Sequence, residues 1–241
     1  AGLNYKTNEV EVTGSITPVK GWKATEDQIL YSSDAGANDA FGNRSVSISG
    51  DYMIVGAHYE ATGGTGSGAI YIYTRNTSTG VWGSEQKILA SDIQAGDQFG
   101  YSVSISGDYA IVGANGKNSV TGAAYVYRRN TSTGVWGSEQ KILAGDRQAG
   151  DEFGWSVSIS GDYAIVGAVY EDAGGSNAGA AYVYTRNTST GVWGSEQKIL
   201  ASDKQASDYF GYSVSISGDY AIVGAFLEDA GGTDAGAAYI Y

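Results

Sequence analysis

The sequence lacks the residues that most often carry redox, metal or acid–base chemistry. It contains no cysteine, one proline and one histidine among 241 residues. The absence of cysteine excludes a disulfide framework and thiol catalysis, and a chain of this length can build a core without disulfides. No apolar run reaches the roughly 18 residues that a transmembrane helix needs. His58 is not repeated, no Ser/His/Asp or metal-ligand spacing is present, and we therefore expect no enzyme.

Positive charge is also scarce. The chain has 14 Lys and Arg against 26 Asp and Glu, which gives a net charge of −12. Binding to nucleic acid or to an anionic membrane surface needs clustered basic side chains, so we expect neither partner. The chain begins Ala1-Gly2-Leu3 without a signal-like segment, which fits either a processed secreted protein or a shortened chain. We expect an extracellular location.

Glycine and tyrosine are abundant, and they occur in a repeated phrase. The chain has 37 glycines and 19 tyrosines, a composition that favours many short strands joined by glycine turns. The phrase Phe-Gly-x-Ser-Val-Ser-Ile-Ser-Gly-Asp-Tyr-x-Ile-Val-Gly-Ala starts at Phe41, Phe99, Phe153 and Phe210, and its first copy is one residue longer. The Gly-Asp-Tyr element recurs after 57, 54 and 57 residues. A repeat of this length indicates a supersecondary unit that packs against its neighbours.

The second copy shows what one repeat contains. Residues 99–106 alternate between bulky and small side chains, which predicts a strand with one aromatic and aliphatic face and one Gly/Ser face. Further strands are predicted at 109–114, 122–128 and 136–144, and the last of these is the most polar. Four antiparallel strands that run from apolar to polar are typical of a β-propeller blade. The repeated Phe, Tyr, Trp and Ile side chains are then interpreted as core.

The two ends of the chain suggest how a ring would close. The last repeat stops at Tyr241 after its third strand, and Trp22–Leu30 resembles the fourth-strand sequence Trp82–Leu89. We therefore predict one all-β domain over 1–241, a four-bladed propeller in which a closing segment at 21–40 completes the last blade. The alternative is a larger ring shared between two chains. Residues 1–20 form an N-terminal extension, in which Val10 and Val12 fit an edge strand.

The repeated phrase resembles the FG-GAP repeat, which is found in integrin α-chain propellers and in many secreted proteins. The residues that carry the resemblance are the Phe-Gly pairs at 41, 99, 153 and 210 and the Gly-Ala pairs at 56, 113, 167 and 224. The resemblance implies a propeller, typically of seven blades, with an Asp-x-Asp-x-Asp-Gly calcium loop in many members. Here that loop is reduced to Ser49-Gly50-Asp51, whose one carboxylate cannot supply six to eight oxygens, so we expect no calcium there and no other cofactor.

The loops after each Gly-Ala pair are the expected ligand site. They vary between copies while the strands around them barely change, and variable loops on a repeated frame are where binding usually occurs. The loops and the segments between blades share one rim and make it acidic, and exposed aromatic side chains beside acids could stack on a sugar. For the aspartates between blades we favour a turn-capping role, with bonds to N–H groups two residues on. The candidate ligand residues are Tyr59, Glu60, Tyr170, Glu171, Asp172, Phe226, Glu228, Asp229 and Asp234.

Asn-Thr-Ser recurs in turns on the opposite rim and matches the N-glycosylation sequence. These candidate sites are Asn76, Asn130 and Asn187, although the same residues also suit a turn.

Three hypotheses for function follow. The first is a binding or adhesion propeller, lectin-like, with a glycan or protein ligand at the acidic rim. The second is a structural module that is a monomer or a small homo-oligomer, and the third, which has least support, is an enzyme acting on polysaccharide.

Overall fold

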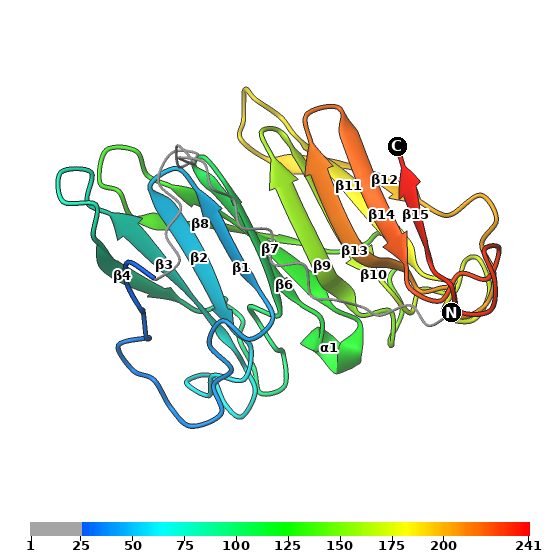
Figure 1. Ribbon diagram of the computed structural model, residues 1–241, viewed down its shortest axis with the longest axis horizontal. Helices are drawn as coiled ribbons and strands as arrows, with labels where there is room; N and C mark the ends of the chain where they lie inside the picture. Colours follow the sequence, from blue (N-terminus) through cyan, green and yellow to red (C-terminus); the bar gives the residue numbers. More distant parts are fainter. Residues whose placement is uncertain (1–25) are drawn as a thin grey trace, which may run out of the picture. The chain divides into compact units, whose positions relative to one another are not determined.

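The computed structural model describes residues 26–241. The chain divides into two compact units, residues 1–30 and residues 31–241, and the strands of the described residues all lie in the second unit. In that unit four antiparallel sheets follow one another in chain order (Figure 1). Each sheet holds one copy of the repeated phrase, so the sequence prediction of one blade per repeat is confirmed. Within the described residues, no helix has the length and apolar character that crossing a bilayer requires.

Three blades have four strands and the last has three. Blade 1 contains β1 (Val46–Ser49), β2 (Tyr52–Ala57), β3 (Ala69–Arg75) and β4 (Trp82–Ile88). Blade 2 contains β5 (Ser102–Ser106), β6 (Tyr109–Ala114), β7 (Ala123–Arg129) and β8 (Trp136–Ile142), with the short helical turn α1 (Lys117–Val120) between β6 and β7. Blade 3 contains β9 (Phe153–Ser160), β10 (Tyr163–Ala168), β11 (Ala180–Arg186) and β12 (Trp193–Ile199). Blade 4 contains β13 (Phe210–Ser217), β14 (Tyr220–Ala225) and β15 (Ala237–Ile240).

Each blade begins with the hairpin that the sequence predicts. Ser106 pairs with Tyr109, and Gly107-Asp108 turns the chain between them. Gly107 has a φ of +56°, a backbone conformation that glycine adopts without the penalty of a Cβ atom. In blade 2 the second strand is apolar and covered on both faces, and its Ile111 and Val112 have no exposed surface.

The Phe-Gly and Gly-Ala parts of the phrase meet across the seams between blades. A Cβ atom added to Gly113 in blade 2 would lie 2.0 Å from the carbonyl oxygen of Gly154 in blade 3. Gly56 and Gly167 face Gly100 and Gly211 in the same way, at 2.0 and 2.1 Å. Only glycine permits this approach of two backbones, so the phrase encodes the contact between neighbouring blades.

Serine hydroxyls complete the same seams. The backbone N–H of Ile105 donates to the Oγ of Ser47 in the preceding blade at 3.2 Å, and that of Ile216 donates to Ser158 at 3.1 Å. The side chains of Ile105, Ile159 and Ile216 are buried in the apolar clusters between blades. The prediction that a small Gly/Ser face stacks on a bulky face is therefore confirmed.

The ring closure that we predicted is not formed by the described residues. Residues 26–40 contain no strand, while residues 21–25, Val10 and Val12 lie outside the described part. Residues 31–39 instead lie on blade 1, where the Tyr73 hydroxyl donates to the Tyr31 carbonyl oxygen at 3.2 Å. β1 packs on β5, β5 on β9 and β9 on β13, and among the described residues no comparable packing joins β1 to β13.

Candidate functional site

The three glutamates of the predicted acidic loops are buried and are held by their own loops. Glu60, Glu171 and Glu228 are 6, 3 and 2% exposed. The carboxylates accept hydrogen bonds from the backbone N–H two residues further on, for example from Ala173 to Glu171 at 3.0 Å. Lys87 and Lys198 of the fourth strands form ion pairs with Glu60 and Glu171 at 2.9 and 2.7 Å. These carboxylates therefore hold the loops in place and offer little surface to a ligand.

The loop aspartates have a similar local role. Asp172 accepts a hydrogen bond from the Asn177 N–H at 2.8 Å, and Asp229 accepts one from the Asp234 N–H at 2.7 Å. Asp172, Asp229 and Asp234 remain exposed. Their part in ligand binding stays a prediction.

The aspartates between blades cap turns, but in the opposite direction from the one that we expected. Asp97 accepts a hydrogen bond from the N–H of Gln94, three residues before it, at 2.7 Å. Asp39, Asp151 and Asp208 do the same with residues 36, 148 and 205. The expected bonds to N–H groups two residues later are not the ones formed, because the turn precedes the aspartate instead of following it.

On the opposite rim, arginines and asparagines hold the turns. Arg75, Arg129 and Arg186 pair with the aspartates of the Gly-Asp turns, Asp51, Asp108 and Asp162. Asn76, Asn130 and Asn187 each accept two backbone hydrogen bonds within their turns, such as those from Ser78 and Thr79 to Asn76. These bonds explain the repeated Asn-Thr-Ser sequence as turn chemistry. Glycosylation of these asparagines stays a prediction.

Aromatic side chains from successive blades form a continuous row beside the loops, and we call this set the aromatic row. The Tyr101 and Trp155 ring centroids are 5.1 Å apart, and those of Trp155 and Tyr212 are 5.5 Å apart. Phe226 stacks on Tyr212 at 4.9 Å, and Tyr170 meets Trp155 edge-on at 6.1 Å. Tyr101 is buried, whereas Tyr212 and Phe226 are exposed, so the row emerges from the protein surface towards blade 4.

Polar groups with unused hydrogen-bonding capacity lie at the buried end of the row. The Arg44 guanidinium lies 4.1 Å from the centre of the Tyr101 ring. The Asn115 side-chain amide donates to Glu152 at 2.7 Å, while its own Oδ1 is buried without a partner among the described residues. Burial raises the pKa of Glu152, although the bond from Asn115 opposes the shift. This end can therefore accept and donate hydrogen bonds to a polar ligand.

His58 and Tyr59 lie next to this end of the row. The His58 ring is 5.5 Å from the Tyr101 ring and 4.2 Å from that of Tyr59. Burial and the charge of Arg44 lower the pKa of His58, which favours the neutral form of its imidazole. Tyr59, which the sequence marks as a ligand residue, is half exposed.

The structure thus unites two groups of aromatic residues that the sequence separates. Tyr170 and Phe226 were predicted from the variable loops, and both join the row. Tyr101, Trp155 and Tyr212 were interpreted as core because they belong to the repeated phrase. A signal was present in the sequence, because their position is occupied by Arg44, Tyr101, Trp155 and Tyr212 in turn while the serine that follows it is constant.

The FG-GAP repeat model matches residues 24–73, 82–127, 136–184 and 193–241. The chain belongs to the FG-GAP repeat family. No curated protein matches it. The last three matched segments begin at the first residues of β4, β8 and β12, so one FG-GAP repeat comprises the outer strand of one blade and the three inner strands of the next.

The calcium loop of many FG-GAP repeats does not fit the residues present here. The Gly-Asp turns offer one carboxylate each, and in blades 1 to 3 that carboxylate is paired with an arginine. Across residues 26–241, no group of three or more His, Asp or Glu side chains is placed to hold a metal ion. The donor set is too small and already neutralised, which argues against calcium at these turns.

Proposed function

We propose that this FG-GAP repeat protein is a non-catalytic binding module that holds a carbohydrate on the aromatic row and works outside the cell. The family supports a propeller-type binding or structural module of a generally non-catalytic kind. The observation that carries the proposal is the row itself, in which Tyr101, Trp155 and Tyr212 come from three successive blades and are extended by Phe226 to the surface.

Aromatic faces suit the apolar C–H faces of a sugar ring, and the neighbouring polar groups suit its hydroxyls. Ligand-binding sites usually combine such apolar surface with a few polar groups that fix the orientation of the ligand. Arg44 and Glu152 supply a donor and an acceptor beside Tyr101 and Trp155, whose side chains are already packed in place. Pre-positioned rings lose little conformational freedom when a ligand binds, which favours affinity.

A hydrolytic role has less support. Glycoside hydrolysis generally uses two carboxyl groups on either side of the scissile bond. Glu152 accepts a hydrogen bond from the Asn115 amide. The pKa of Glu152 is shifted by burial and by this bond, and no second carboxylate in the described part of the chain contributes to the shift. We therefore place the function in binding.

A glycan array with the purified protein tests this proposal. We expect retained glycans, and we expect Trp155→Ala to weaken their binding by roughly tenfold or more, the loss that truncating an anchor residue typically causes. Tyr212→Phe should keep binding because the ring remains, while Tyr212→Ala should weaken it. Tyr31→Ala serves as the control, since this exposed ring lies outside the row and only its carbonyl oxygen is used.

Absence of any retained glycan would overturn the proposal, and so would equal affinity of the wild type and Tyr212→Ala. The Tyr212 pair of variants guards against a folding artefact, because Tyr212 is 40% exposed and the phenylalanine variant keeps the ring.

A further inference from the structure

An acid and an amide form a pair at the buried end of the aromatic row, at the seam between blades 2 and 3. The Asn115 amide nitrogen donates to the Glu152 carboxylate at 2.7 Å. Asn115 is 4% exposed, and its other polar atom, Oδ1, is buried without a partner among residues 26–241. Leaving a buried acceptor without a donor costs free energy. The pair therefore contains an acceptor that one further donor would satisfy.

The backbone holds Glu152 in place at this seam. Its φ is +53°, a left-handed conformation that residues with a Cβ atom adopt uncommonly. Its N–H donates to the Val120 carbonyl oxygen, in the loop after β6, at 2.9 Å. Its own carbonyl oxygen accepts from the Trp155 N–H in β9 at 3.1 Å. Because these bonds tie the residue to both blades, the carboxyl group is positioned before a ligand arrives.

The chemistry of this pair differs from that at the other seams, although the backbone is the same. The residue before each repeated Phe has a φ between +53° and +59°, and it is Ala40, Gln98, Glu152 or Tyr209. The residue after each Gly-Ala pair is His58, Asn115, Val169 or Phe226. A carboxyl group thus meets an amide at the seam between blades 2 and 3, whereas the neighbouring seams combine His58 with Gln98 and Val169 with Tyr209.

The groups that face the Glu152 carboxyl group are mainly aromatic. Burial, and after it the charge of Glu152, raise the pKa of the Tyr170 hydroxyl. Burial also raises the pKa of Tyr101, on which the charges of Arg44 and Glu152 act in opposite directions. The neighbouring Asp151 is engaged in its own turn. For Glu152 itself, burial raises the pKa and the bond from the amide lowers it, so the surroundings disfavour its charge.

The two protonation states of Glu152 use the amide of Asn115 differently. As a carboxylate, Glu152 can only accept, so the amide nitrogen has a partner and Oδ1 has none. As a carboxylic acid, Glu152 can donate its own proton to Oδ1 while its other oxygen keeps the bond from the amide nitrogen. The acid form therefore satisfies the amide within the protein, and the carboxylate form leaves acceptors free for the hydroxyl groups of a ligand.

We propose that Glu152 and Asn115 form a proton-controlled end of the aromatic row, which accepts hydrogen bonds from a ligand as the carboxylate and pairs with itself as the carboxylic acid. The inference rests on the proposed function, because it adds regulation to the same site. Ligand and proton then compete for Glu152. By linkage, acidification weakens binding by up to roughly tenfold for each pH unit below the pKa of the free protein. The site holds a sugar at neutral pH and releases it in acid.

A ¹³C NMR titration of the glutamate carboxyl groups in the full chain tests the pair without any ligand. We expect the Glu152 signal, assigned by its loss in Glu152→Gln, to titrate with a midpoint above the ordinary 4.5. The side-chain ¹⁵N signal of Asn115 should move with the same midpoint, because the amide gains a bond when the acid forms. A Glu152 midpoint at or below 4.5, or an Asn115 signal that does not respond, would overturn the proposal.

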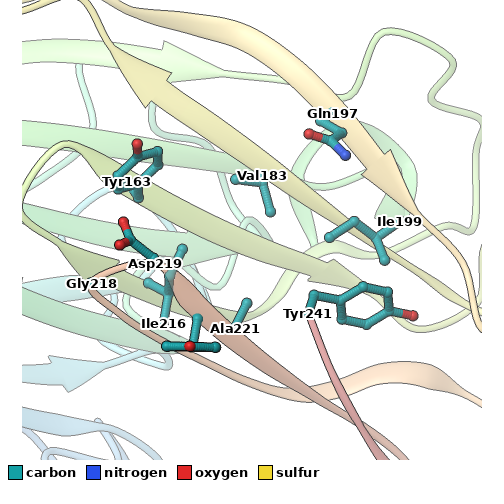
Figure 2. Close-up of a pocket in the computed structure, with 10 residues that line it drawn as sticks. Tyr163, Val183, Gln197, Ile199, Ile216, Gly218, Asp219, Ala221 and Tyr241 are labelled. Atoms are coloured by element: carbon teal, nitrogen blue, oxygen red, sulfur yellow. The ribbon is translucent and has the colours of Figure 1, made fainter.

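The glycan array, read at pH 7.5 and at one pH unit below the measured midpoint, tests the effect on binding. The wild type should bind roughly tenfold more weakly at the lower pH. Glu152→Gln, a neutral copy of the acid form, should bind weakly and equally at both. Asp219→Asn is the control: Figure 2 shows Asp219 and Gln197 on different blades of another pocket, and no hydrogen bond joins them in the described part of the chain. This variant should keep the pH dependence of the wild type.

The fold accepts the variants that this test needs. Gln98 and Ala40 occupy the position of Glu152 in other copies with φ values of +55° and +59°, so Glu152→Gln and Glu152→Ala keep the backbone conformation. A pH dependence of binding that persists in both variants belongs to another group, such as His58, and contradicts the proposal.

The two experiments separate this inference from the proposed function. If no glycan is retained at any pH while Glu152 and Asn115 titrate together above 4.5, the proton-controlled pair stands and the carbohydrate ligand is wrong. If glycans are retained equally at both pH values, binding on the row stands and the proton control is wrong.

Discussion

The seam between blades 2 and 3 and the outward face of blade 4 have nearly the same sequence in opposite environments. Ile111 of blade 2 is fully buried by blade 3, whereas Ile222 at the equivalent position of blade 4 is 43% exposed. The repeated phrase therefore does not by itself bury its residues; a following blade does. The phrase therefore encodes the packing of one blade on the next.

The comparison also separates the contacts that fold a blade from those that join blades. Blade 4 forms its β13–β14 hairpin in the same register as the other blades. Gly224 and the exposed side chains of Ile222 and Ile240, in contrast, have no partner surface on another blade among the described residues. A blade can thus form from local pairing, while most apolar burial comes from its neighbours, as in other repeat proteins.

The largest expected effect concerns the glycines that face the next blade. In Gly113→Ala the new Cβ would lie 2.0 Å from the Gly154 carbonyl oxygen, so we expect a loss of about 3 kcal/mol or more of unfolding free energy, or no folding. Gly224→Ala meets only the Ser213 hydroxyl of its own blade at close range, a group that can rotate away, and should lose about 1 kcal/mol or less. Urea unfolding of dilute samples measures both.

Because Gly113 also meets its own Ser102 hydroxyl, the two variants differ mainly in the next-blade carbonyl. Equal destabilisation of both would mean that the blade itself, and not the seam, requires glycine at this position.

A smaller difference is expected for the isoleucines of the inner strands. Ile105→Ala removes a side chain that is 5% exposed, and we expect a loss of about 2–5 kcal/mol. Ile48→Ala changes an equivalent side chain that is 65% exposed, and in dilute solution we expect a change within about 0.5 kcal/mol. Thermal and urea unfolding provide the measurement.

Most of the blade could be predicted from the sequence because its signals are local. The alternation of residues 153–160 predicts β9, and the constant Gly-Asp pair predicts the turn that follows a strand. Arg75 pairs with Asp51 of the Gly-Asp turn in its own blade. Such features depend on neighbours in one blade, which the sequence order specifies.

The site and the closure were harder to predict because they depend on contacts between blades. Trp155 has the side chain of a core residue, and only its position between Tyr101 and Tyr212 makes it part of a row. Glu171 looked like a surface acid, yet Lys198 from another strand pairs with it in a buried position. Whether Trp22–Leu30 completes the last blade of its own chain depends on the distance between this segment and that blade, which local sequence patterns do not specify.

The smallest expected effect on stability is the difference between replacing Asp146, between blades 2 and 3, and replacing Asp203, the equivalent aspartate before blade 4. Asp146 accepts hydrogen bonds from Lys198 at 2.6 Å and Tyr182 at 2.9 Å, whereas Asp203 accepts one from Tyr239 and has no lysine partner among the described residues. Burial alone would raise the pKa of Asp146, but the two bonds outweigh it and lower this pKa below the ordinary value of 3.8.

A carboxyl whose pKa is lowered in the folded state stabilises the protein above its ordinary pKa, and this contribution is lost as the pH falls through the folded value. Asp146→Asn should therefore lower the unfolding free energy at pH 7 by less than about 1 kcal/mol, because the carboxylate is half exposed and screened by solvent. The deficit should shrink as the pH falls below 3.8, and Asp203→Asn should show almost none. A pH series of urea unfolding curves measures this difference, and equal deficits in both variants would show that the lysine pairing of the inner blades adds nothing to stability.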